Sequence, residues 1–194
     1  MMMAAHEALY TLAMAIEDLP PERLFTLANK RLYGLGKRSF VALGYFAGNG
    51  DSLDYLVAGQ PPPLLRRLDG TVEELPLPEH RVPLGALPKG VYSPLSIELK
   101  PGELLLAYSD GVTDARSPEG EFFGEQRLED VVASTVTLDP DDLVSQVLAA
   151  VKAFTRGGLL YDDVTLLAIG RGAESEPFDP ESEPSRSVDV KRGG

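Results

Sequence analysis

The spacing of apolar and polar positions predicts helices in the first part of the chain. Apolar residues recur at helical spacing over residues 2–17. The pair Pro20–Pro21 ends this pattern, because proline breaks a helix interior but fits the first turn of a new helix. A second helix is expected from there to Gly34 or Gly36, and its inward stripe is Leu24, Leu27, Ala28 and Leu32.

The middle of the chain has the pattern of antiparallel strands. Short apolar runs alternate with Gly, Pro and Asp-Gly turn signals, which favour hairpins. The runs expected to be strands are 39–47, 53–58, 64–68, 72–75, 95–99 and 103–108. They predict three hairpins, with turns at 48–51, 69–70 and 100–102. The Pro- and Gly-rich residues 76–94 are expected to form a surface loop.

The last part of the chain predicts two more helices and a strand. Residues 125–133 indicate a short helix, and a longer one should begin with Asp139 as its N-cap and Pro140 as its first helical residue. Residues 164–169 form an apolar, strand-like run. The core stripe expected on the longer helix is Val144, Val147, Leu148, Val151 and Phe154.

Helices that bracket antiparallel hairpins indicate an α+β domain. The 194 residues, 43% of them hydrophobic, suffice for one domain with a full core, which we place at residues 1–170. Beyond it, residues 171–194 are rich in Glu, Ser, Pro and Arg without periodicity. They are expected to be a disordered tail.

Composition narrows the classes of function. A net charge of −12 disfavours nucleic-acid partners and anionic membrane surfaces, and no apolar run has the length of a membrane span. The chain has no cysteine and two histidines, so a bound metal would be held chiefly by oxygen. We expect a cytoplasmic protein without nucleic-acid binding or membrane insertion.

Two short segments carry the candidate chemistry. Asp110 follows the apolar run 103–108, and Asp162 with Asp163 precedes the run 164–169. Carboxylates held at the ends of strands make a rigid oxygen site of the kind that Mg²⁺ or Mn²⁺ prefers. Taken alone, Ser109–Asp110–Gly111 is better explained as a turn, and Asp162–Asp163 is equally explained as a capping or turn feature. The metal site therefore depends on the two segments occurring together.

Four stretches resemble one family in the same order along the chain. They are VAGQPPPLL at 57–65, PLG at 83–85, GELLLAYSDGVTDA at 102–115 and DDVTLL at 162–167. Over residues 2–170 the chain is similar to bacterial PPM-type (protein phosphatase 2C-like) serine/threonine phosphatases of the sporulation and stress-response regulators. That resemblance implies an antiparallel β-sandwich with helices on both outer faces.

The resemblance also implies site roles. Asp110 and Asp162 correspond to metal ligands, and Asp163 corresponds to a neighbouring carboxylate that supports the site or binds an additional ion. The implied cofactors are two Mn²⁺ or Mg²⁺ ions, which activate a water for attack on a phosphoserine or phosphothreonine. The implied substrate is a phosphorylated regulatory protein, an anti-sigma-factor antagonist, acted on under the control of an upstream sensory region.

The chain departs from the family at its beginning. The family motif Gly-Asp-x-x-Gly-His-Gly, whose Asp bridges both metals, has no counterpart here. We therefore expect an N-terminally incomplete phosphatase domain with exposed sheet edges, weak metal binding, and association between copies of the chain. The alternative is a catalytically inactive phosphatase-like module that binds a regulatory partner.

Overall fold

A computed structural model describes residues 19–35, 40–79, 81–158, 160 and 162–172. The expected helix at 2–17, His6, His80 and most of the expected tail lie outside these residues. The helices are α2 (Pro21–Tyr33), α3 (Asp110–Thr113), α4 (Gly124–Ser134) and α5 (Pro140–Phe154). The strands are β1 (Leu43–Asn49), β2 (Ser52–Ala58), β3 (Leu64–Arg66), β4 (Val72–Glu74), β5 (Leu95–Glu98), β6 (Leu104–Tyr108) and β7 (Leu166–Gly170).

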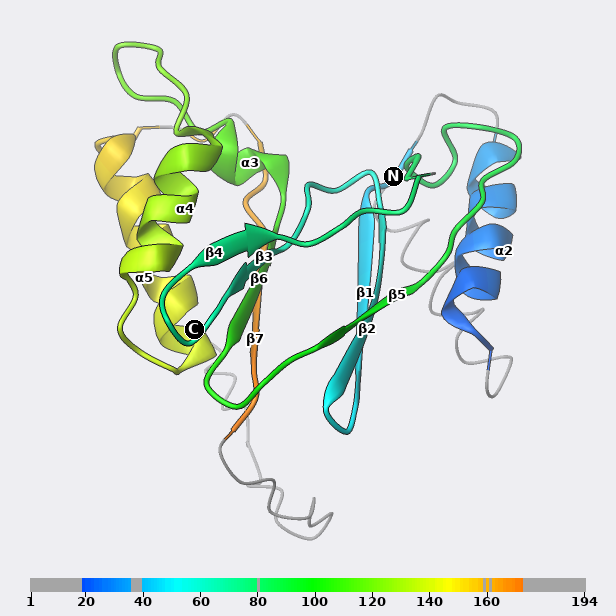
Figure 1. The fold of residues 1–194 in the computed structure, drawn as a ribbon. Coiled ribbons are helices and arrows are strands. Elements are labelled where there is room, and N and C mark those ends of the chain that lie inside the picture. Colours follow the sequence, from blue (N-terminus) through cyan, green and yellow to red (C-terminus); the bar gives the residue numbers. More distant parts are fainter. Residues whose placement is uncertain (1–18, 36–39, 80, 159, 161, 173–194) are drawn as a thin grey trace, which may run out of the picture.

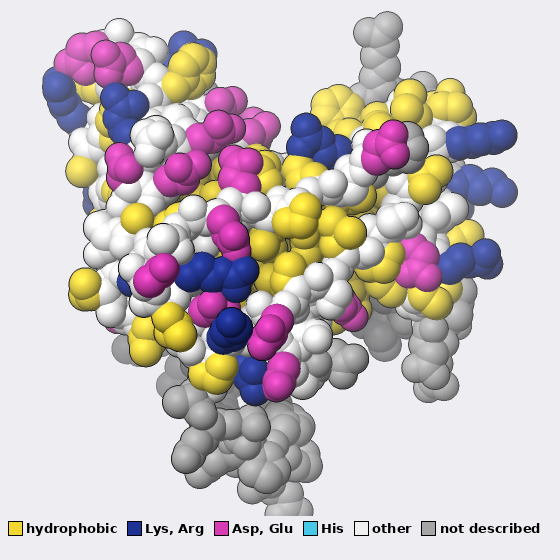
Figure 2. Space-filling view, in the orientation of Figure 1, with side chains coloured by type: hydrophobic (Ala, Val, Ile, Leu, Met, Phe, Trp, Pro, Cys, Tyr) yellow, Lys and Arg dark blue, Asp and Glu magenta, His cyan; other side chains and the backbone are white. Residues whose placement is uncertain are grey.

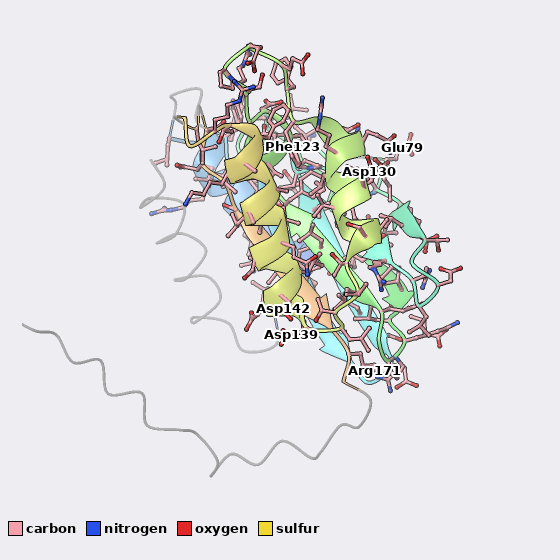
Figure 3. The ribbon with its side chains drawn as sticks, turned by 90° about the vertical axis from the view of Figure 1, so that its left-hand side faces the viewer. Glu79, Phe123, Asp130, Asp139, Asp142 and Arg171 are labelled. Carbon is pink, nitrogen blue, oxygen red and sulfur yellow. The ribbon has the colours of Figure 1, made fainter. Side chains whose placement is uncertain are left out.

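Two antiparallel sheets form a sandwich between layers of helices (Figure 1). One sheet has the strand order β1-β2-β5, and the other has the order β4-β3-β6-β7. Helix α2 covers the outer face of the first sheet, while α4 and α5 lie side by side over the second (Figure 3). The expected α+β sandwich with helices on both outer faces is confirmed.

Alternation along the strands builds a separate apolar layer on each side of each sheet. Leu105 and Ala107 of β6 face the first sheet and pack with Leu53 and Tyr55. Their neighbours in β6 face α4 and α5, so β6 is buried on both sides. A third cluster lies between α2 and the first sheet. This arrangement explains why 104–108 is a continuous apolar run in the sequence.

Two expected hairpins are confirmed, and the third is wrong. β1 pairs with β2, and β3 pairs with β4, around the predicted turns. β5 and β6 do not pair with each other: β5 adds to β2, and β6 lies between β3 and β7. The turn at 100–102 is therefore a corner where the chain changes sheets. β6 takes a central position because it is apolar on both faces, whereas β5 is half exposed and lies at an edge.

The buried face of α2 is rotated from the expected stripe. Ala28 and Leu32 are buried as predicted, but Leu24 and Leu27 are only partly buried, and Phe25, which the sequence did not predict to face inward, is buried. Asn29 is also buried, and its side chain binds the loop between β4 and β5. Its Oδ1 accepts from the Gly85 N–H (2.8 Å) and its Nδ2 donates to the Leu87 carbonyl (3.1 Å).

Helix α5 begins as the sequence predicts. Asp139 is the N-cap, its Oδ1 accepts from the Asp141 N–H at 2.8 Å, and Pro140 opens the helix. Asp139 lies at the end of α5 farthest from Phe123 in the view of Figure 3. The buried stripe is Leu143, Val147 and Val151, which recur every fourth residue. The prediction for Leu148 is wrong, because that side chain is 45% exposed.

Two of the four family-like stretches contact each other away from the carboxylates. Gly59 follows β2 with φ +75°, and its N–H donates to the Arg81 carbonyl at 2.7 Å. A Cβ at Gly59 would lie 2.4 Å from Pro83 Cγ, so the close approach requires glycine. The stretches 57–65 and 83–85 thus form part of the scaffold around the first sheet.

Candidate functional site

The first candidate segment lies where β6 ends. Ser109 is extended (φ −89°, ψ 159°), and Asp110 begins the short helix α3, which the sequence did not predict. The Asp110 carboxylate is exposed, while Gly111 and Val112 behind it are buried. Strand β6 is held between β3 and β7, so the position of Asp110 is set by a central strand of the sheet.

Ser109 joins this segment to the second one. Its hydroxyl donates to the Asp163 carbonyl (2.9 Å) and accepts from the Thr165 N–H (2.9 Å). Its own N–H donates to the Thr165 carbonyl (3.0 Å). These three hydrogen bonds bring residues 109–111 beside residues 162–165, more than fifty positions away along the chain. The turn that the sequence predicts at Ser109 does not indicate these contacts, because their partners lie on the segment before β7.

Gly111 allows the closest approach between the two segments. A Cβ at this position would lie 2.5 Å from the Asp163 carbonyl oxygen and 3.0 Å from its carbonyl carbon. Both atoms belong to the backbone and cannot turn aside as a flexible side chain could. A glycine is therefore needed for the two segments to lie in contact.

Asp162 and Asp163 precede β7 and have exposed side chains. The Asp162 Oδ1 accepts from the Asp163 N–H at 2.8 Å, which is the local capping pattern considered from the sequence. Asp162 also lines a pocket together with Asp114, Arg116 and Phe122. In Figure 2, Asp and Glu side chains gather on the part of the surface over α3 and α4, whereas Lys and Arg project from α2.

Tyr108 directly precedes this site but is not suited to accept a proton. The side chain is 3% exposed, and burial raises the pKa of its phenol to about 12, with Glu125, Glu74 and Glu129 contributing in the same direction. The phenol therefore stays neutral at physiological pH.

The residues that the structure describes do not fit a complete two-metal centre. Within them, no group of three or more His, Cys, Asp or Glu side chains is placed to hold a metal ion. Asp110 and Asp162 come from adjoining segments and present oxygen donors, which suit Mg²⁺ or Mn²⁺. A hard divalent cation needs more oxygen ligands than this pair provides.

The β-sandwich between helical layers, with carboxylates at the end of a central strand, is the fold of the PP2C-type phosphatases. The chain matches the sequence profile of the Stage II sporulation protein E (SpoIIE) family over residues 1–172. It belongs to that family. Among the residues described, no helix is long and apolar enough to cross a membrane.

A curated relative and two solved phosphatase domains are similar to this chain. Protein IcfG of Synechocystis sp. (strain ATCC 27184 / PCC 6803 / Kazusa) is 34% identical over 122 residues, which make up 62% of this chain and 18% of IcfG. The SiaA-PP2C domain of Pseudomonas aeruginosa has a TM-score of 0.72 at 19% identity, covering 87% of this chain and 68% of that domain.

The manganese-presoaked phosphatase domain of SpoIIE from Bacillus subtilis has a TM-score of 0.56 at 18% identity. That match covers 91% of this chain and 76% of the SpoIIE domain. The chain thus spans less than a fifth of its curated relative IcfG and most of two phosphatase domains.

Proposed function

We propose that this chain is the catalytic region of a metal-dependent protein serine/threonine phosphatase. The observation that carries the proposal is the contact between residues 109–111 and 162–165, which positions Asp110 and Asp162 on adjoining segments. Membership of the SpoIIE family supports phosphatase chemistry at this contact. Asp163 is the neighbouring carboxylate, and its backbone carbonyl holds Ser109.

The metal ligands in this proposal are Asp110 and Asp162. Bound Mn²⁺ or Mg²⁺ supplies charge stabilisation for the phosphate and lowers the pKa of a coordinated water. A centre of two ions requires further oxygen ligands from outside the described residues. Ser109 and Gly111 hold the two segments in contact. This contact keeps both carboxylates at the same end of the paired strands β6 and β7.

The proposed substrate is a phosphoserine or phosphothreonine on a regulatory protein in the cytoplasm. Within the family resemblance, that protein is an anti-sigma-factor antagonist. Because the chain carries a net charge of −12, a phosphorylated partner experiences repulsion until cations are bound. Activity should therefore depend strongly on the divalent ion.

Hydrolysis of a phosphoserine peptide with Mn²⁺ tests the proposal, on this chain and on the full-length protein that contains it. Asp110→Asn and Asp162→Asn should each lower kcat by at least about 100-fold, because each removes a charged ligand. Asp130→Asn is the matched control, since Asp130 is exposed on α4 and bonds Gln126 there. Full activity in both site variants would reject the assignment.

A second candidate function is a phosphatase-like module that binds a regulatory partner without turnover. The absence of a three-ligand group among the described residues favours it. Calorimetric titration with Mn²⁺ separates the two candidates. Binding that is lost in Asp110→Asn supports the enzyme, whereas tight partner binding with no metal uptake by the full-length protein supports the module.

A further inference from the structure

A pocket of about 300 Å³ opens beside Asp162. Its lining residues are Asp114, Arg116, Phe122 and Asp162. Asp114 follows helix α3, and Arg116 with Phe122 belongs to the loop between α3 and α4. The pocket therefore adjoins the proposed metal ligands, yet two of its residues come from a loop that neither carboxylate segment includes. Its volume is at the lower end of the range for ligand sites.

The loop that carries Arg116 is folded back on itself. Arg116 and Phe122 form an antiparallel bridge, and the Ser117 N–H donates to the Glu121 carbonyl at 2.9 Å. The base of the loop is closed by the Phe123 N–H, which donates to the Ala115 carbonyl at 2.8 Å. Phe123 itself is buried against the helices. The two ends of the loop are thus tied to the core.

Arg127 of α4 holds this loop from outside the pocket. Its guanidinium donates to the carbonyls of Phe122 and Phe123, both at 3.0 Å. Arg156, just after α5, forms an ion pair with Glu119 at 2.8 Å, but both side chains are more than half exposed, so this pair contributes little to the position of the loop. Because α4 binds the base of the loop, Arg116 is presented at a defined place on the pocket wall.

Arg116 makes a cation–π contact with Phe122. The guanidinium carbon is 4.2 Å from the centre of the Phe122 ring. This contact holds the guanidinium against the ring. A planar guanidinium binds two oxygens of a phosphate as a fork rather than as a point charge.

Arg116 differs in charge from the acidic residues that line the same pocket. Among the described residues of the lining, Arg116 is positively charged, whereas Asp114 and Asp162 are acidic. A phosphorylated side chain that approaches Asp162 therefore meets one complementary group in the lining.

We propose that Arg116, positioned by Phe122, binds the phosphate of the phosphorylated serine or threonine in the substrate. This inference rests on the proposed phosphatase function and deepens it, because it assigns recognition of the phosphate to the α3–α4 loop. Arg116 is a substrate-binding residue in this proposal, and Phe122 is its positioning residue.

Binding can be measured without turnover. Fluorescence anisotropy with this chain, in the presence of Mn²⁺, compares a labelled peptide that carries a non-hydrolysable phosphonate analogue of phosphoserine with the same peptide carrying serine. Wild type should prefer the phosphorylated peptide. Arg116→Gln should weaken binding of that peptide by roughly tenfold, as expected for loss of a charge-assisted hydrogen bond, and leave the unphosphorylated peptide unchanged.

Arg156→Gln is the matched control. The substitution removes one positive charge near the same loop, but Arg156 lies outside the pocket lining. The affinity of this variant for the phosphorylated peptide should therefore stay within about twofold of wild type. Arg116→Lys should recover only part of the loss, because lysine keeps the charge without the fork. In the full-length enzyme, Arg116→Gln should raise KM while kcat changes little.

The outcomes separate this inference from the proposed function. Equal effects of Arg116→Gln and Arg156→Gln, or no phosphate preference in wild type, overturn the role of Arg116 even if hydrolysis is observed. Loss of phosphate preference in Arg116→Gln supports that role even if hydrolysis is absent, and the chain is then a phosphopeptide-binding module. A melting curve unchanged by Arg116→Gln excludes unfolding as the cause.

Discussion

Gly111 is the residue at which the two parts of the candidate site come closest. The Asp163 carbonyl occupies the space that any larger side chain would need. Ser109, two positions earlier, adds three hydrogen bonds to the same partner segment. The geometry of the carboxylates therefore depends on two small neighbours that carry no charge.

We predict that Gly111→Ala destabilises the domain and separates the two segments. A Cβ at 2.5 Å from a backbone oxygen forces the backbone to move, at a cost of about 1–3 kcal/mol. Thermal unfolding should show the lower stability, and hydrogen exchange at the Thr165 N–H should become faster.

Gly48→Ala is the control for that substitution. Gly48 lies in β1 without a positive φ, and a Cβ there meets nothing within 4 Å. Its melting temperature should stay close to wild type. Equal stability of the two alanine variants would contradict the role assigned to Gly111.

The acidic residues of the site could be nominated from sequence, but the residues that align them could not. Asp110 and Asp162 stand beside apolar runs, which is a local signal. Ser109 and Gly111 look like ordinary turn residues, since their partners lie more than fifty positions away. The pocket lined by Arg116, Phe122 and Asp162 was also missed, because Asp162 is distant from the other two residues in the sequence.

At the scale of elements, predictions succeeded where the signal was contained in a few neighbouring residues. The start of α5 at Pro140 follows from the N-cap Asp139 and the proline itself. The turn at Asp69–Gly70 follows from turn chemistry, and its hairpin is confirmed. The partner of β5 was predicted wrongly, because a corner between sheets and a hairpin turn have the same local sequence signature.

We predict that Asp139→Ala destabilises the domain by about 1 kcal/mol. The substitution removes the acceptor for the Asp141 N–H at the first turn of α5. Urea unfolding measures the change. The control is Asp141→Ala, which keeps the cap side chain, although it removes one charge from the first turn. A cap variant as stable as this control would show that the side-chain bond contributes nothing.

At the scale of the whole molecule, each sheet ends in outer strands that pair on one side only with the other described strands. β1 and β7 are outer strands of their sheets in the described part of the chain. Leu167 of β7 lies opposite Ala107, on the face that packs between the sheets, yet it is 45% exposed. An apolar edge of this kind favours pairing with another chain.

We predict that copies of this chain associate through the β7 edge. Light scattering should give a mass above that of the monomer, and Leu167→Lys should shift it toward the monomer, since a charge on an edge strand opposes pairing. Leu148→Lys is the matched control, because Leu148 is also 45% exposed but lies on α5. A monodisperse monomer in wild type would refute the prediction.

The sequence by itself determined the class of fold, the order of the described helices and strands other than α3, and the acidic residue types at the two candidate segments. These features depend on side-chain periodicity, caps and turns, whose signals span a few residues. The tertiary structure decided which sheet each strand joins, that residues 109–111 meet 162–165, and that Arg116 faces the pocket beside Asp162. Contacts between distant segments depend on how apolar faces are buried together, and that choice is made by the whole core.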